Sequence, residues 1–176
     1  MSAPHATKTF VGGRVKASDL YTGALVEYLG EKNGISTLIR TAYLPRQYLA
    51  DEFLDGEVLK NGYFLDIHGM RDNGEFELAV GTGLLSCEMY SRELAFISET
   101  AARLGISYRV NHPQYSGIAK MTAFTARLQR KFEEPRILQF EFSRSLRDFY
   151  TCPDNVLTRT LPFLEELIFF LNYQKK

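Results

Sequence analysis

The most constraining feature of the sequence is residues 63–69, an apolar run that contains an Asp-x-His and ends at a glycine. As a β-strand, its alternation places Leu65 and Ile67 on one face of a sheet and Asp66 and His68 on the other. In α/β proteins the carboxyl ends of the strands form the edge where chemistry is usually placed. The segment therefore predicts a strand that brings an imidazole to that edge, with a buried, hydrogen-bonded core histidine as the alternative.

The rest of the chain alternates between helical and extended patterns. The expected helices cover residues 19–29, 87–104, 118–132 and 156–172, and the expected strands cover residues 35–42, 63–68, 76–80, 106–110 and 137–142. Residues 1–18 are expected to be loop, with at most a very short strand near the start, and residues 43–61 to be loop with one short helix. This alternation predicts one α/β layered domain over residues 1–176.

Composition argues against several classes of function. Lys plus Arg and Asp plus Glu number 21 each, so no net charge attracts nucleic acid or an anionic membrane. No apolar run reaches membrane-spanning length, and the first residues lack the regions of a secretory signal. Cys87 and Cys152 lie outside any Cys-x-x-Cys, which suits a reducing compartment or at most one disulfide. We expect a cytoplasmic protein that binds neither nucleic acid nor membrane.

The last predicted helix contains the apolar run 167–171. We expect this helix to cover either the sheet or a second copy of the chain, which leaves a homo-oligomer open.

Three segments of the sequence supply side chains that can bind a metal ion at the edge occupied by His68. His5 lies in a Pro-His loop, and Asp19 stands at a predicted helix start. Two neutral imidazoles and one carboxylate form a catalytic zinc set, whose remaining position holds a water with its pKa lowered toward about 7. Asp66 can accept the second imidazole N–H of His68 from outside the ligand set. Helix capping is the alternative for Asp19, and a disordered terminus is the alternative for His5.

Glu141 lies among apolar residues in the predicted strand 137–142. A carboxylate in such a strand requires a partner or a function. We interpret it as a general base, and then general acid, beside a metal-activated water. An ion pair with Arg144 or Arg147 is the alternative.

The ordered set of motifs resembles the N-formylglutamate amidohydrolase family, distant relatives of the zinc carboxypeptidases and aspartoacylases. The motifs are Ala3-Pro4-His5, Asp19-Leu20-Tyr21-Thr22, Phe64-Leu65-Asp66-Ile67-His68-Gly69, Gly81-Thr82-Gly83, Asn111-His112-Pro113-Gln114-Tyr115-Ser116-Gly117 and Leu138-Gln139-Phe140-Glu141-Phe142-Ser143-Arg144. The resemblance covers most of the chain. It implies a compact three-layer α/β/α sandwich around a mixed sheet, and zinc-dependent hydrolysis of a linear amide such as an N-acyl amino acid or a small peptide-like substrate.

The resemblance also implies roles for individual residues. The implied zinc ligands are His5, Asp19 and His68, and Glu141 matches the strand glutamate that acts as general base and acid. Asn111 falls in the loop that lines the substrate pocket. Arg46 and Arg144 are the candidates for binding a carboxylate or stabilising an oxyanion.

Two other interpretations remain open from the sequence. One is a binding or regulatory module that keeps the hydrolase fold without catalysis. The other is a metal-free enzyme with Cys87 as nucleophile at a helix start, for which no histidine is placed by the sequence as a partner.

Overall fold

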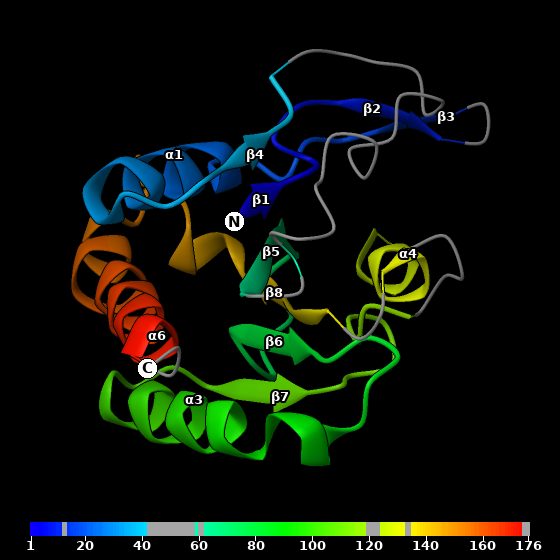
Figure 1. The fold of residues 1–176 in the computed structure, drawn as a ribbon. Coiled ribbons are helices and arrows are strands. Elements are labelled where there is room, and N and C mark those ends of the chain that lie inside the picture. The colour runs from blue at the N-terminus through cyan, green and yellow to red at the C-terminus, as the bar shows by residue number, and fades with distance from the viewer. Residues whose placement is uncertain (12–13, 42–58, 60–61, 119–123, 133–134, 174–176) are drawn as a thin grey trace.

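The structure is a computed structural model that describes residues 1–11, 14–41, 59, 62–118, 124–132 and 135–173. It has an α/β architecture, in which a central sheet lies between helices (Figure 1). The strands are β1 (Ser2–Ala3), β2 (Thr9–Val11), β3 (Arg14–Lys16), β4 (Leu38–Ile39), β5 (Tyr63–Gly69), β6 (Leu78–Gly81), β7 (Tyr108–Val110) and β8 (Arg136–Phe142). The helices are α1 (Thr22–Asn33), α3 (Ser91–Arg103), α4 (Phe124–Lys131), α5 (Pro153–Asn155) and α6 (Leu161–Tyr173), with 3-10 turns η2 (Cys87–Tyr90) and η3 (Arg144–Leu146) and a π-helical turn η4 (Val156–Thr160).

The main sheet has six strands in the order β4-β1-β5-β8-β6-β7. Strands β5 and β8 run parallel and pair along their whole length, from Tyr63 opposite Arg136 to Gly69 opposite Phe142. Strand β6 runs antiparallel to β8, and β7 runs parallel to β6. The sheet is therefore mixed, as expected.

The two faces of the sheet differ in what covers them. Leu65 and Ile67 of β5 pack with α1, α3 and α6 in the main hydrophobic core, together with alternate residues of β8. On the opposite face, Phe64 packs with Leu128 of α4. Helices therefore cover both faces in three layers, and the predicted face assignment of β5 is confirmed.

Helix α6 covers the main core face of the sheet, which is one of the two positions expected for it. Its buried residues are Leu161, Phe163, Leu164, Leu167, Ile168 and Leu171. Phe169 and Tyr173 lie outside, 63% and 59% exposed, with ring centroids 4.4 Å apart. Among the described residues, no helix combines the length and the apolarity needed to cross a bilayer.

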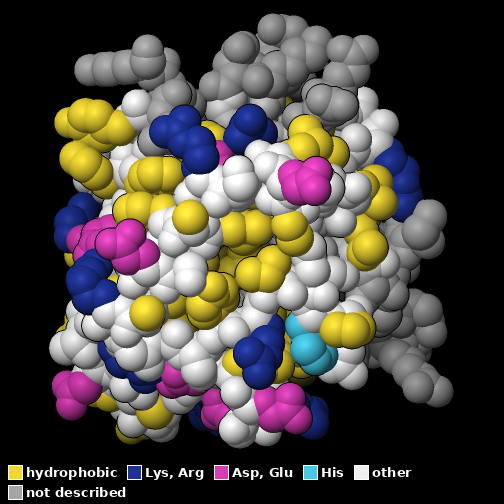
Figure 2. Space-filling model, turned by 90° about the horizontal axis from the view of Figure 1, so that it is seen from below, with side chains coloured by type: hydrophobic (Ala, Val, Ile, Leu, Met, Phe, Trp, Pro, Cys, Tyr) yellow, Lys and Arg dark blue, Asp and Glu magenta, His cyan; other side chains and the backbone are white. Residues whose placement is uncertain are grey.

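The face of the molecule at the bottom of Figure 1 is chemically mixed. Figure 2 shows hydrophobic side chains gathered at its centre, with both acidic and basic side chains around them. This distribution agrees with the balanced charge of the sequence.

Several element boundaries differ from the sequence expectations. Helix α1 begins at Thr22 rather than residue 19, because Tyr21 has a left-handed φ of 69° and Thr22 bonds back to the Asp19 carbonyl. The prediction of loop over residues 1–18 is wrong for β2 and β3, which pair as an antiparallel hairpin. Extended-favouring residues flank two glycines there, which is a hairpin signal that the prediction did not use.

The predicted helix over residues 87–104 is instead a 3-10 turn followed by α3, and the side chain of Tyr90 anchors the turn. The Tyr90 hydroxyl accepts from the Ile137 amide (2.9 Å) and donates to the Ile137 carbonyl (3.0 Å). Strand β6 pairs with β8 only as far as Gln139, so the Tyr90 hydroxyl takes the place of a strand partner for the backbone groups of Ile137. Burial raises the pKa of Tyr90 to about 12, which keeps this hydroxyl protonated.

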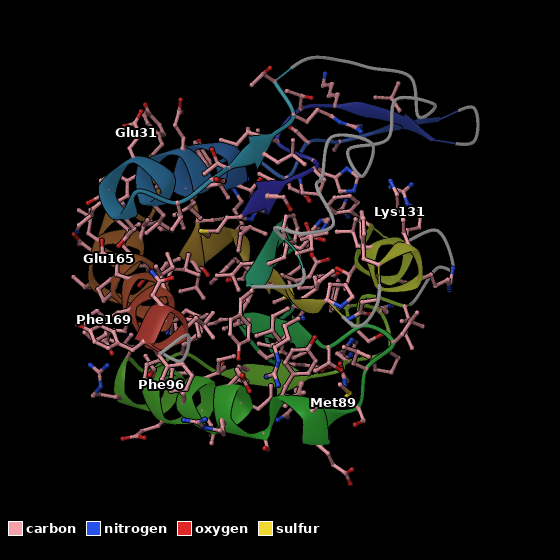
Figure 3. All side chains as sticks on the ribbon, viewed as in Figure 1. Glu31, Met89, Phe96, Lys131, Glu165 and Phe169 are labelled. Carbon is pink, nitrogen blue, oxygen red and sulfur yellow. The ribbon has the colours of Figure 1, made fainter. Side chains whose placement is uncertain are left out.

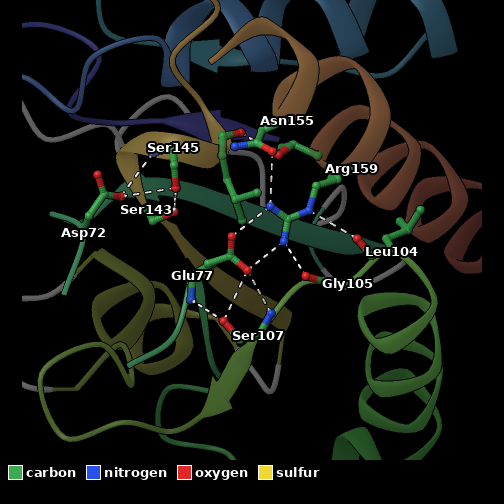
Figure 4. A network of polar contacts seen from close by, with 11 residues as sticks. Asp72, Glu77, Leu104, Gly105, Ser107, Ser143, Ser145, Asn155 and Arg159 are labelled. Carbon is green, nitrogen blue, oxygen red and sulfur yellow. Dashed lines mark hydrogen bonds and ion pairs between the residues drawn. The ribbon is translucent and has the colours of Figure 1, made fainter. Parts of the chain in front are cut away.

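An ion pair between Glu77 and Arg159 fastens η4 to the start of β6 (Figure 4). The guanidinium donates from Nη1 and Nη2 to the two carboxylate oxygens at 2.8 and 2.7 Å, which is a two-point contact. It also donates to the carbonyls of Leu104 and Gly105 after α3. Burial would raise the pKa of Glu77, but Arg159 and Ser107 outweigh it and hold that pKa below its ordinary value.

Replacing Arg159 with methionine is expected to destabilise the fold at neutral pH by about 1–2 kcal/mol, allowing for partial solvent screening. Because the pKa of Glu77 is lower in the folded chain, its contribution is present above the unfolded pKa and is lost as pH falls. The stability difference between wild type and Arg159→Met should therefore shrink from about pH 5 downward. Urea unfolding from pH 3 to 7 measures this difference.

Arg103→Met is the control, since its ion pair with Glu166 is largely exposed (55% and 41%). It should change stability by less than about 0.5 kcal/mol. A difference between wild type and Arg159→Met that stays constant across this pH range would contradict the assigned role of Glu77.

Candidate functional site

The three predicted metal ligands lie together in the structure. The His68 Nδ1 atom is 3.4 Å from Asp19 Oδ2, and the rings of His5 and His68 have centroids 5.2 Å apart. The Asp19 amide also donates to the His5 carbonyl at 2.8 Å. The Asp19 carboxylate therefore faces His68, and the N-cap residue of α1, Tyr21, makes no side-chain capping hydrogen bond.

Asp66 holds the other side of the His68 ring. Its Oδ2 atom is 3.1 Å from His68 Nε2 and accepts a hydrogen bond from the Thr125 hydroxyl (3.1 Å), while its Oδ1 atom accepts one from the Ser2 hydroxyl (2.6 Å). Burial would raise the pKa of Asp66, but His68 and these two hydroxyls outweigh it and hold the pKa below its ordinary value. Asp66 is thus a buried carboxylate with hydrogen bonds from three elements, β1, β5 and α4.

The charge state of His68 follows from these neighbours. Burial by itself would lower the pKa of His68, but the carboxylates of Asp66 and Asp19, with the charge of Glu141, raise it well above its ordinary value. In this structure the imidazole therefore favours the protonated form, with one N–H toward each of two carboxylates.

Glu141 lies beside His68 because of strand register. The two residues are Cα partners on β5 and β8, so their side chains share one face of the sheet. On its other side, Glu141 is opposite Ala79 of β6, a small residue. The side-chain amide of Gln139 donates from Nε2 to Glu141 Oε1 at 3.0 Å and so orients the carboxylate.

Two further predicted residues have polar contacts elsewhere. The Asn111 side chain accepts from the Thr82 amide (2.9 Å) and donates to Thr82 Oγ1 (3.0 Å) and Cys87 Sγ (3.2 Å). Arg144 donates from Nε to Asp148 Oδ2 at 3.0 Å, with the Arg144 side chain 55% exposed. Arg46 lies outside the described residues.

The cluster fits zinc in donor chemistry but not in preformed geometry. In the described part of the chain, no group of three or more His, Cys, Asp or Glu side chains is arranged to hold a metal ion. The donors His5, Asp19 and His68 are nevertheless two imidazoles and a carboxylate, the set used at catalytic zinc sites. Asp66 at the second nitrogen of His68 corresponds to the outer partner that such ligands usually have.

Sequence reasoning missed several residues that support this cluster. Ser2 and Thr125 bond Asp66, and nothing in their sequence context distinguishes them from other small polar residues. Gln139 has a readable signal, because it precedes Glu141 by two positions and therefore shares its face of β8.

No family model and no curated protein matches this chain. A solved structure named "YNDL-apo (Zinc-free)" is similar, with 15% sequence identity and a TM-score of 0.49. The similarity covers 87% of this chain and 77% of the other.

Proposed function

We propose that His5, Asp19 and His68 bind zinc and that the chain hydrolyses a linear amide, in the manner of the N-formylglutamate amidohydrolase family that its motifs resemble. The observation in favour is the position of His68, with Asp19 at one ring nitrogen and Asp66 at the other. The three candidate ligands, at positions 5, 19 and 68, are far apart in the sequence. A core histidine with only a structural role would not need another imidazole and a carboxylate beside it. The proposed fold class within the α/β proteins is that of the zinc exopeptidases.

The orientation of the His68 ring suits a metal ligand. Zinc binds the neutral ring, so the proton on Nδ1 would have to leave. The Asp66 carboxylate at Nε2 favours keeping the remaining proton there, and Nδ1, on the side of Asp19, would be the ligand atom. Zinc, when bound, supplies a Lewis acid that polarises the amide carbonyl and lowers the pKa of a water.

The residues of the chain would handle the protons and the substrate. Glu141, oriented by Gln139, would take a proton on its carboxylate from the attacking water and return it to the leaving amine. We propose that Asn111, Arg46 and Arg144 contact the substrate, with a guanidinium on the carboxylate of an N-acyl amino acid.

A second candidate function is a binding or regulatory module with this fold and no catalysis. The observation that favours it is the position of His68 between the carboxylates of Asp19 and Asp66, which raise the pKa of His68 and so can hold a protonated ring without a metal. In that case the cluster would only hold together the segments that carry His5, Asp19 and His68, and it would have no catalytic role.

Zinc binding separates the two functions. The purified chain should bind about one zinc ion by calorimetry and elemental analysis, and His68→Ala should lose that binding because a ligand is removed. His112→Ala is the matched control, since the His112 ring stacks on Tyr115 and should leave zinc binding unchanged. A screen of N-acyl amino acids, N-formylglutamate included, then tests for hydrolysis. Failure of the wild type to bind zinc would reject the hydrolase in favour of the module.

A further inference from the structure

The buried side chain of Arg147 joins three segments of backbone. Only 7% of the residue is exposed. Its guanidinium donates from Nη1 to the Leu20 carbonyl (2.6 Å), from Nη2 to the Met70 carbonyl (3.0 Å) and from Nε to the Phe142 carbonyl (3.1 Å). A planar guanidinium with fixed donors is suited to hold three acceptors at set angles.

Each accepting carbonyl lies within two residues of a residue of the candidate site. Leu20 follows Asp19, Phe142 follows Glu141, and Met70 lies two residues after His68. One side chain therefore bridges the loop before α1, the end of β5 and the end of β8. These are the segments whose relative positions decide how the three site residues meet.

Two local features show that the chain is built around this guanidinium. A Cβ atom at Gly69 would lie 2.5 Å from Arg147 Nε, so β5 ends in glycine where the guanidinium passes. Tyr21, next to Leu20, has a φ of 69°, a costly conformation for an aromatic residue that persists only where its surroundings impose it. The Arg147 bond to the Leu20 carbonyl is one such constraint.

The turn that contains Arg147 is itself fixed to the end of β5. Asp72 accepts hydrogen bonds from the Ser145 amide and hydroxyl, at 3.2 and 3.4 Å (Figure 4). The position of Arg147 is therefore set in part by the loop that directly follows the strand presenting His68.

We propose that Arg147 is a positioning residue that fixes Asp19, His68 and Glu141 relative to one another through these three carbonyls. It does not touch the substrate. The inference depends on the proposed function for what the three residues do, but the bridging of the segments can be tested without it.

The test compares Arg147→Met and Arg147→Lys with Arg159→Met, the control that removes a multiply bonded arginine outside the site cluster. Zinc alone is the probe, by calorimetry. We expect both Arg147 variants to bind zinc about 10–100-fold more weakly than wild type, as for other residues that orient metal ligands. Lysine keeps the charge but cannot reach three carbonyls with fixed geometry, so it should not restore affinity. Arg159→Met should keep wild-type affinity.

Hydrogen exchange supplies a readout that is independent of zinc. Amides of residues 17–22 should exchange several-fold faster in the Arg147 variants than in wild type or Arg159→Met. If Arg147→Met does not fold, Gly69→Ala displaces the guanidinium while leaving Arg147 in the sequence.

The possible results separate the two hypotheses. Unchanged exchange in the Arg147 variants would overturn the positioning role, as would equal loss of zinc affinity in Arg159→Met. Faster exchange in a chain whose wild type binds no zinc would support the bridging and reject the proposed hydrolase.

Discussion

Glu141→Gln is expected to reduce kcat by about 10²–10⁴-fold while zinc affinity stays close to that of the wild type. Glutamine keeps the shape of the side chain and the hydrogen bond from Gln139, but it cannot accept and return a proton. Because Glu141 is not among the proposed ligands, the metal should remain. Steady-state kinetics on the substrate found in the screen, together with zinc calorimetry on the same sample, measure both effects.

Glu88→Gln is the matched control for this prediction. Glu88 lies in η2 at the surface and has no proposed role, so its kcat should equal that of the wild type. Full activity in Glu141→Gln would remove Glu141 from the mechanism. Loss of zinc in the same variant would instead make it a ligand.

Phe163→Ala is expected to lower the free energy of unfolding by about 3–5 kcal/mol. Phe163 is fully buried in α6, and its ring lies edge-on to Phe140 and Phe142 of β8, with centroids 6.2 and 6.4 Å apart. Truncation removes these contacts and leaves a cavity against the central strand. Such a loss is a large fraction of the roughly 5–15 kcal/mol that stabilises a typical domain. Urea unfolding with a fixed m-value measures it.

Phe169→Ala on the same helix is the control for Phe163→Ala. Phe169 projects outward (Figure 3), is 63% exposed and contacts Tyr173. Its loss should cost less than about 1 kcal/mol, since little buried surface is removed. Equal destabilisation by the two substitutions would mean that α6 does not face the sheet as described.

The elements with strong periodicity were predictable from the sequence. The alternation in β5 assigned its residues to the correct faces, because a strand places successive side chains on opposite sides of a sheet whatever its neighbours are. The end of α3 before Gly105 is close to the predicted end at residue 104, whereas α1 continues past the predicted end at residue 29 to Asn33, just before Gly34. Both glycines have a φ above 60°, which other residues rarely adopt.

Short and boundary elements were less predictable. Strand β1 has two residues, and it is a strand because β4 and β5 pair with it on both sides. The start of α1 depends on the left-handed Tyr21, a conformation that no local preference of tyrosine favours.

The sequence by itself determined which side chains share a face of a strand, as with Asp66 and His68 on β5, and with Gln139 and Glu141 on β8. Only the tertiary structure decided that His5 and Asp19 lie against His68 and that Arg147 reaches three separate carbonyls. The physical reason is the separation along the chain over which each feature is set. Side-chain alternation is a property of a few bonded residues, whereas contacts between residues 19 and 147 depend on strand order and on the helices that cross between strands.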